Sequence, residues 1–167
     1  KSESNDMNYL GLNEEKVTRT VNDMNRLLSN YHVYYQNLRN FHWNIHGENF
    51  FDLHNKFEDL YNDAREKIDE IAERILTLRH IPLSRMSDYL AMAKVEESEI
   101  LQTDKDMVDK LLEDHEILIS NMRDVINSAD EANDEGTIDM IGGFLEQLEK
   151  RSWMFDAWRE RKLEPAE

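Results

Sequence analysis

One uninterrupted apolar stripe, in residues 50–78, constrains the fold more than any other feature. Apolar side chains recur there at steps of three and four residues, which is the period of one face of an α-helix. No proline or glycine interrupts this segment. It therefore predicts a long amphipathic helix that buries one face against other elements. The stripe consists of Phe50, Leu53, Phe57, Leu60, Tyr61, Ala64, Ile68, Ile71, Ile75 and Leu78.

The same period predicts three further long helices, over residues 13–44, 104–128 and 135–161, with Asn13 as the N-cap of the first. The whole chain has only two prolines and five glycines, and 40% of its residues are apolar. Its 167 residues suit one domain with one core. We therefore expect an all-α bundle domain over residues 13–161, between a flexible N-terminal tail, 1–12, and a short acidic C-terminal tail, 162–167.

The connection between the second and third long helices, residues 80–103, decides the topology. It contains a shorter helical pattern at residues 85–93. A helix of about 28 residues is about 42 Å long, and about 20 extended residues span that distance at about 3.3 Å each. The third long helix can therefore run parallel to the second, after a crossover along the bundle, rather than in a simple up-down arrangement.

A stripe of metal-ligand residue types runs beside the apolar stripe. His54 and Glu58 are four residues apart, so both side chains can reach one ion. Asp69 and Glu73 repeat that step. The two pairs are separated by eleven residues, or about 16 Å along a helix, whereas ligand bonds are about 2.0–2.6 Å long. The two pairs therefore cannot share one metal ion within one chain.

A two-fold axis would bring the two pairs together. If this helix packs antiparallel against its copy at the level of Asp63 and Ala64, each pair meets the other pair of the partner helix, and two identical sites form. His42 lies twelve residues before His54 and can fold back towards it through a turn at residues 46–49. The predicted metal site is then His42, His54 and Glu58 from one subunit with Asp69 and Glu73 from its partner.

These segments resemble the Dps family, the mini-ferritins named as DNA-binding proteins from starved cells. The resemblance rests on FHWNIHGENFFDLH at residues 41–54, on F-x-x-L-Y beginning at Phe57, and on DEIAER at residues 69–74. It implies a ferritin-like four-helix bundle with a short helix in the long crossover. It also implies that Glu58 stands where some members have aspartate. The family's ferroxidase ligands fall on His42, His54, Asp69 and Glu73.

What the resemblance implies for function is iron detoxification and storage. Members of the family form hollow dodecamers, oxidise Fe²⁺, typically with hydrogen peroxide, at sites between subunits, and keep Fe³⁺ as a mineral. We therefore expect a ferroxidase that is a homo-oligomer and binds iron singly or in pairs. The chain has no Glu-x-x-His step, the pattern of di-iron sites inside a single bundle. The resemblance also implies a bacterial, cytoplasmic protein and leaves association with the nucleoid open.

Charge and composition limit the partners. The formal net charge is −16, which repels nucleic acid and attracts metal cations. Residues 1–12 hold one lysine against two acids, so they do not supply the basic DNA-binding tail of many family members. The absence of cysteine excludes disulfides, and no apolar run is long enough for a membrane span. Two alternatives remain: a protein that protects DNA by condensing it, with little ferroxidase activity, and a helical assembly that buffers another divalent metal.

Four other residues have roles that the sequence leaves open. Trp43 is either an aromatic that intercepts radical equivalents beside the iron, as the resemblance implies, or an interface packing residue. Asp130, Asp134 and Asp139 either line an acidic pore for cations or are loop and helix-capping acids. His115 has no partner at ligand spacing, and we expect it to be exposed and without a role.

Overall fold

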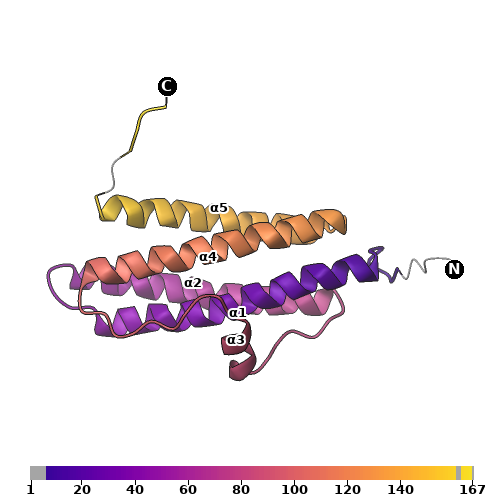
Figure 1. The fold of residues 1–167 in the computed structure, drawn as a ribbon, viewed down its shortest axis with the longest axis horizontal. Helices are drawn as coiled ribbons and strands as arrows, with labels where there is room; N and C mark the ends of the chain where they lie inside the picture. The colour runs from indigo at the N-terminus through magenta and orange to yellow at the C-terminus, as the bar shows by residue number, and fades with distance from the viewer. Residues whose placement is uncertain (1–6, 161–162, 167) are drawn as a thin grey trace.

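The computed structural model describes residues 7–160 and 163–166 of the chain. Four long helices lie side by side, and one short helix stands off them (Figure 1). No helix in the described part of the chain is both long enough and apolar enough to cross a bilayer. The helices are α1 (Glu14–Asn44), α2 (Phe50–Thr77), α3 (Met86–Met92), α4 (Asp104–Glu131) and α5 (Glu135–Trp158).

The four long helices pack as two antiparallel pairs, α1 with α2 and α4 with α5, and α1 also packs against α4 (Figure 1). Helices α2 and α4 run in the same direction, because the segment between them returns along the length of the bundle. The short helix α3 lies within that segment and contacts α1. The predicted all-α, ferritin-like four-helix bundle with a short helix in its crossover is confirmed.

The core of the bundle is formed by the apolar stripes of all four long helices. From the stripe of α2, Phe57, Ile71 and Ile75 have no exposed surface. Burial of such side chains contributes about 1.5–3 kcal/mol each, so the stripes fix which face of every helix points inward. The largest completely buried side chains include Tyr31, Phe41, Phe57, Met24, Leu38, Met107 and Leu111.

Three buried asparagines of α1, Asn25, Asn30 and Asn37, hold the crossover against the bundle. Their side-chain oxygens accept hydrogen bonds from crossover amides at 2.7–3.0 Å. The four donating residues lie outside any helix or strand, so no regular secondary structure pairs their amides. An unpaired buried amide would cost about 1–3 kcal/mol, so the asparagines give a long connection one defined path. The donating amides are those of Leu83, Lys94, Val95 and Ser98.

Two helix ends differ from the prediction. Helix α4 continues to Glu131 rather than ending at Ser128, which shortens the loop to α5. Asn133 then lies just after the helix in the left-handed region, with φ of 55°. Asparagine adopts this conformation more readily than most residues. Helix α5 ends at Trp158, before the predicted end at Arg161, and residues 161–162 lie outside the described part of the chain.

The structure describes only residues 7–12 of the predicted N-terminal tail. They form a turn in which the Gly11 amide donates to the Asn8 carbonyl at 3.0 Å. Leu10 and Leu12 pack against the core. At the other terminus the described residues after α5 are exposed.

Candidate metal centre

His42, near the end of α1, and His54, in the second turn of α2, lie face to face. Their rings stack with centroids 3.7 Å apart and planes 18° apart. The Nδ1 of each ring lies 2.7 Å from the backbone carbonyl oxygen of the other residue. A carbonyl oxygen can only accept, so each Nδ1 carries a proton, and in the neutral ring each Nε2 holds the lone pair. These reciprocal bonds fix the tautomer that binds a metal through Nε2, and they orient both rings.

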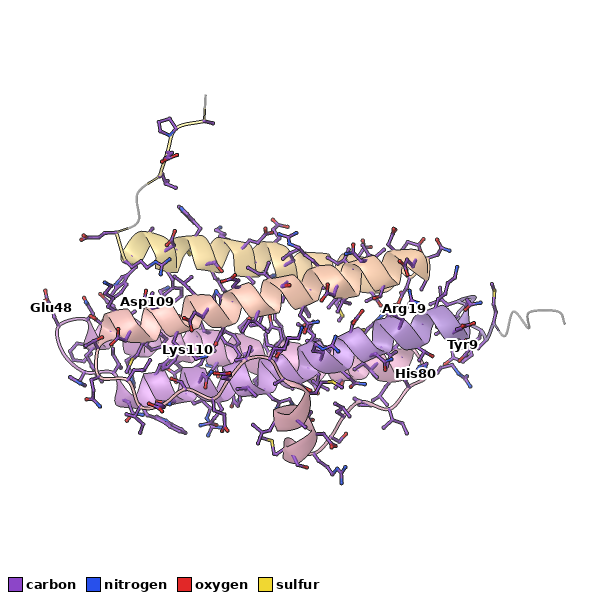
Figure 2. All side chains as sticks on the ribbon, viewed as in Figure 1. Tyr9, Arg19, Glu48, His80, Asp109 and Lys110 are labelled. Carbon is purple, nitrogen blue, oxygen red and sulfur yellow. The ribbon has the colours of Figure 1, made fainter. Side chains whose placement is uncertain are left out.

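The turn between α1 and α2, residues 45–49, makes this pairing possible. Gly47 has φ of 100°, a backbone conformation that glycine adopts without strain. The Phe50 amide donates to the Gly47 carbonyl at 3.1 Å, which closes the turn. The ring of Phe50 stacks on His54 at 4.8 Å and covers one side of the pair. Figure 2 labels Glu48, which marks this end of the bundle.

Glu58 follows His54 by one helical turn and is half-buried. Tyr61 lies between Glu58 and His42: its hydroxyl donates to Glu58 Oε1 at 3.4 Å, and its ring meets the His42 ring edge-on at 5.2 Å. Partial burial and the Glu58 carboxylate raise the pKa of Tyr61. The structure thus brings three of the five predicted ligands to one end of the α1–α2 pair.

Asp69 and Glu73 lie further along α2 and are exposed. Because α2 is continuous from Phe50 to Thr77, their distance from the histidine end is about 16 Å or more. Within residues 7–160 and 163–166 of one chain, no three metal-binding side chains converge on a common point. Asp69 instead borders a surface hollow that is also lined by Tyr89 of α3. The sharing of all five ligands across a two-fold axis stays a prediction.

Asp134 is not available to line a cation entrance, contrary to one reading of the sequence. It is only 2% exposed and accepts a hydrogen bond from Arg74 Nη2 at 2.8 Å. It also accepts from the backbone amide of Thr137 at 3.2 Å, so it is the N-cap of α5. The capping reading is therefore correct for this residue. Asp130 and Asp139 are exposed, and a role for them in a pore stays a prediction.

His115 of α4 is buried, with 1% of its surface exposed, so the prediction of an exposed histidine is wrong. Its Nε2 lies 2.7 Å from the Tyr34 hydroxyl, and its Nδ1 lies 2.8 Å from Ser152 Oγ. Ser152 Oγ donates to the Leu148 carbonyl at 2.7 Å, so it accepts from Nδ1. Both ring nitrogens are therefore engaged within the protein.

The sequence did carry a signal for the burial of His115. It falls four residues after Leu111 and three before Leu118, both of which are completely buried. A histidine at that position of a helix lies on the core stripe. Ligand spacing along one helix does not indicate this role, because His115 pairs with a tyrosine of α1.

Comparison with known proteins places this arrangement in a family. A family model described as a ferritin-like domain matches residues 21–162. The DNA protection during starvation protein of Porphyromonas gingivalis is 42% identical over 148 residues, which cover 89% of this chain and 93% of that protein. The crystal structure of a Dps protein from Vibrio cholerae O1 has a TM-score of 0.90 at 39% identity, covering 95% of this chain and 100% of that one. That protein is described as a member of a broad superfamily of ferritin-like diiron-carboxylate proteins.

A second solved structure, the Dps protein from Bacillus brevis, has a TM-score of 0.85 at 36% identity and covers 87% of this chain and 98% of that one. The family match extends over nearly the whole bundle, and residues 21–162 include both histidines on α1 and α2. The chain belongs to the Dps family of ferritin-like proteins.

Proposed function

We propose that this protein takes up Fe²⁺, oxidises it and stores the product as a ferric mineral inside a hollow homo-dodecamer. The oxidant that we propose is hydrogen peroxide. Two Fe²⁺ ions can reduce one peroxide to water without releasing hydroxyl radical, so the reaction removes two harmful reactants together. Membership of the Dps family supports this proposal, and the histidine pair on α1 and α2 supports the location of the reaction.

In the proposed site, Fe²⁺ binds between two subunits. His42 and His54 offer Nε2 atoms and Glu58 offers a carboxylate from one chain, while Asp69 and Glu73 offer carboxylates from the partner. Imidazole and carboxylate together suit iron, and the carboxylates favour the harder Fe³⁺ product. The protein positions the ions and neutralises their charge, and the redox chemistry belongs to the metal.

The observation that carries the location is the reciprocal hydrogen bonding of His42 and His54. Each ring is oriented by a backbone carbonyl and retains one unused nitrogen. A histidine pair with only a structural role would have no need to leave both Nε2 atoms free. The net charge of −16 supports the attraction of cations to the assembly and argues against a coat on DNA.

A hybrid experiment tests whether the site is shared between subunits. We expect Asp69→Asn and His54→Ala chains to be inactive alone, because each lacks one ligand in every site. In a mixed dimer, the first chain supplies intact His54 and the second supplies intact Asp69, so one of the two sites is complete. Peroxide-dependent Fe²⁺ oxidation, measured without oxygen, should therefore recover when the two chains are refolded together.

The matched control for the hybrid is a mixture of Asp69→Asn with Glu73→Gln chains. Both changes remove the same half of the site, so no complete site can form and the mixture should stay inactive. Native mass spectrometry confirms that mixed dimers are present. A failure of the complementary mixture to recover, in confirmed hybrids, would show that the ligands are not shared in this way.

A further inference from the structure

A buried chain of hydrogen bonds runs from Tyr34 through the interior of the bundle, apart from the candidate metal centre. The Tyr34 hydroxyl lies 2.7 Å from His115 Nε2, and His115 Nδ1 lies 2.8 Å from Ser152 Oγ. Because Ser152 donates to the Leu148 carbonyl, it must accept from His115, and His115 must accept from Tyr34. Tyr34 is therefore the donor to an imidazole nitrogen that holds a lone pair.

The surroundings keep this pair as a neutral phenol and a neutral imidazole. Burial, with the positive charge of Arg151, lowers the pKa of His115 to about 3. Burial and the nearby Tyr31 and Asp114 raise the pKa of Tyr34 well above that of an ordinary phenol. The pair thus persists over the whole neutral range, with the proton on oxygen and the base beside it.

A phenol that loses one electron becomes a strong acid, so its oxidation is favourable only where a base accepts the proton at once. Tyr34 has such a base at 2.7 Å. The buried Tyr89 does not, because its hydroxyl donates to the Leu83 carbonyl at 2.8 Å, and a carbonyl is not a useful proton acceptor. Tyr61 faces a carboxylate, Glu58, but at 3.4 Å. Of these three tyrosines, Tyr34 is the best placed to be oxidised.

Aromatic rings connect this pair to the candidate metal centre. The ring centroids of His42 and Tyr61 are 5.2 Å apart, and those of Tyr61 and Tyr35 are 6.0 Å apart. Tyr35 and Tyr31 are four residues apart on α1, so they are neighbours on the helix surface. Tyr31 in turn lies 5.9 Å from Tyr34. Electron transfer falls steeply with distance. The three ring contacts, with the one-turn step from Tyr35 to Tyr31 along α1, divide the path into short steps.

We infer that Tyr34 and His115 form a one-electron reservoir for peroxide reduction, an inference that rests on the iron oxidation proposed above. When one Fe²⁺ meets hydrogen peroxide, the O–O bond takes one electron from iron and one from Tyr34. Two solvent protons complete two water molecules. The phenolic proton of Tyr34 moves to His115 Nε2, which leaves Fe³⁺, a tyrosyl radical and an imidazolium.

A second Fe²⁺ then restores the pair. It gives one electron to the tyrosyl radical, the proton returns from His115 to the Tyr34 oxygen, and a second Fe³⁺ is formed. The sum of both steps is two Fe²⁺, one peroxide and two protons giving two Fe³⁺ and two water molecules. A site that holds a single iron ion can thereby reduce peroxide by two electrons without releasing hydroxyl radical.

The test is a freeze-quench experiment read by high-field electron paramagnetic resonance. The assembled protein receives one Fe²⁺ per site and then hydrogen peroxide, without oxygen, and iron oxidation is followed by absorbance in the same sample. We expect a tyrosyl signal whose g values show a hydrogen bond to the phenoxyl oxygen, and its loss when a second Fe²⁺ is added. Tyr34→Phe and His115→Gln should lose this signal, and trapped hydroxyl radical should increase in both.

Tyr89→Phe is the matched control, because it removes a buried tyrosine whose hydroxyl has a carbonyl partner instead of a base. It should keep the signal. Persistence of an unchanged signal in Tyr34→Phe or in His115→Gln would overturn the inference.

A flash-generated ruthenium tris-bipyridyl oxidant separates this inference from the proposed iron site. It oxidises the protein without any iron. If iron is not oxidised in the first experiment but the flash still produces the Tyr34 radical, the proposed function fails and the reservoir stands. If iron is oxidised but neither route produces a radical at Tyr34, the reservoir is wrong and the iron site stands.

Discussion

The α1–α2 end of the bundle and its interior use histidine in opposite ways. At the end, His42 and His54 each use one nitrogen on a carbonyl and keep the other free. In the interior, His115 uses both nitrogens, on Tyr34 and Ser152. The difference teaches that the hydrogen-bond partners of a histidine, more than its burial, decide whether it can bind a metal.

Charge follows the same division. Between α2 and α5, Lys67 Nζ lies 2.7 Å from Asp63 Oδ1, and Arg151 lies 2.6 Å from Asp63 Oδ2. Burial alone would raise the pKa of Asp63, but the hydrogen bonds from Arg151 and Lys67 outweigh it and hold that pKa below its usual value. The Asp63 carboxylate is therefore paired with two cationic side chains, and a metal ion would have to displace them to bind there. Asp69 and Glu73, which are proposed as ligands, are by contrast exposed.

The largest effect that the comparison predicts is on catalysis. Replacing both His42 and His54 by alanine should lower the rate of peroxide-dependent Fe²⁺ oxidation by about 100-fold or more, since loss of an outer-shell partner alone costs about 10–100-fold. The assembly should stay intact by size-exclusion chromatography. An oxidation rate close to that of the wild type would remove the histidine pair from the site.

The second prediction concerns stability at the interior histidine. His115→Leu leaves the buried hydroxyl of Tyr34 without its acceptor. The free energy of unfolding should fall by about 1–3 kcal/mol, which is the cost of one unsatisfied buried group. The exposed His46 is the control, and His46→Leu should change stability by less than about 0.5 kcal/mol. Denaturant titration measures both, and equal effects would contradict the comparison.

The smallest effect is a pH dependence. The pKa of His115 is about 3 in the folded chain, whereas an unfolded histidine titrates near pH 6.5. Below about pH 6.5 the unfolded state binds a proton at this histidine and the folded state does not. The contribution of neutral His115 to the free energy of unfolding is therefore fully present above that pH. It falls as the pH is lowered, by at most about 1.4 kcal/mol per pH unit.

His115→Gln isolates this pH term, because glutamine can accept from Tyr34 and donate to Ser152 without titrating. The difference in melting temperature between the wild type and this variant should shrink or reverse as the pH falls from about 7 to about 5. A difference that stays constant over this range would show that His115 has the same pKa in the folded and unfolded states.

Most of the fold could be predicted, because the helical period and the length of a connection can be read directly from the sequence. The stripe that ends at Leu78 predicted α2 almost to the residue, and the length of the crossover predicted the parallel direction of α4. The end of α4 could not be predicted, because it depends on Asn133 in a left-handed conformation and on the burial of Ala129. Helix ends reflect such tertiary contacts more than propensity.

The candidate site could be predicted only in part, for a related reason. Spacing along one helix placed Glu58 beside His54, and the turn at residues 46–49 was expected to return His42. Contacts between distant segments leave no such periodic trace. The pairing of Tyr34 with His115 joins residues 81 positions apart, and the local sequence around either residue does not indicate its partner.

The asparagines that hold the crossover have a consequence for the order of folding. Their hydrogen bonds to it join residues that are 58–65 positions apart in the chain. Such bonds can form only after α1 is in place and the loop through α2 has closed, which makes them late events. In a refolding experiment read by hydrogen exchange, the amides of Lys94, Val95 and Ser98 should gain protection last. In the native protein they should be among the first to lose it.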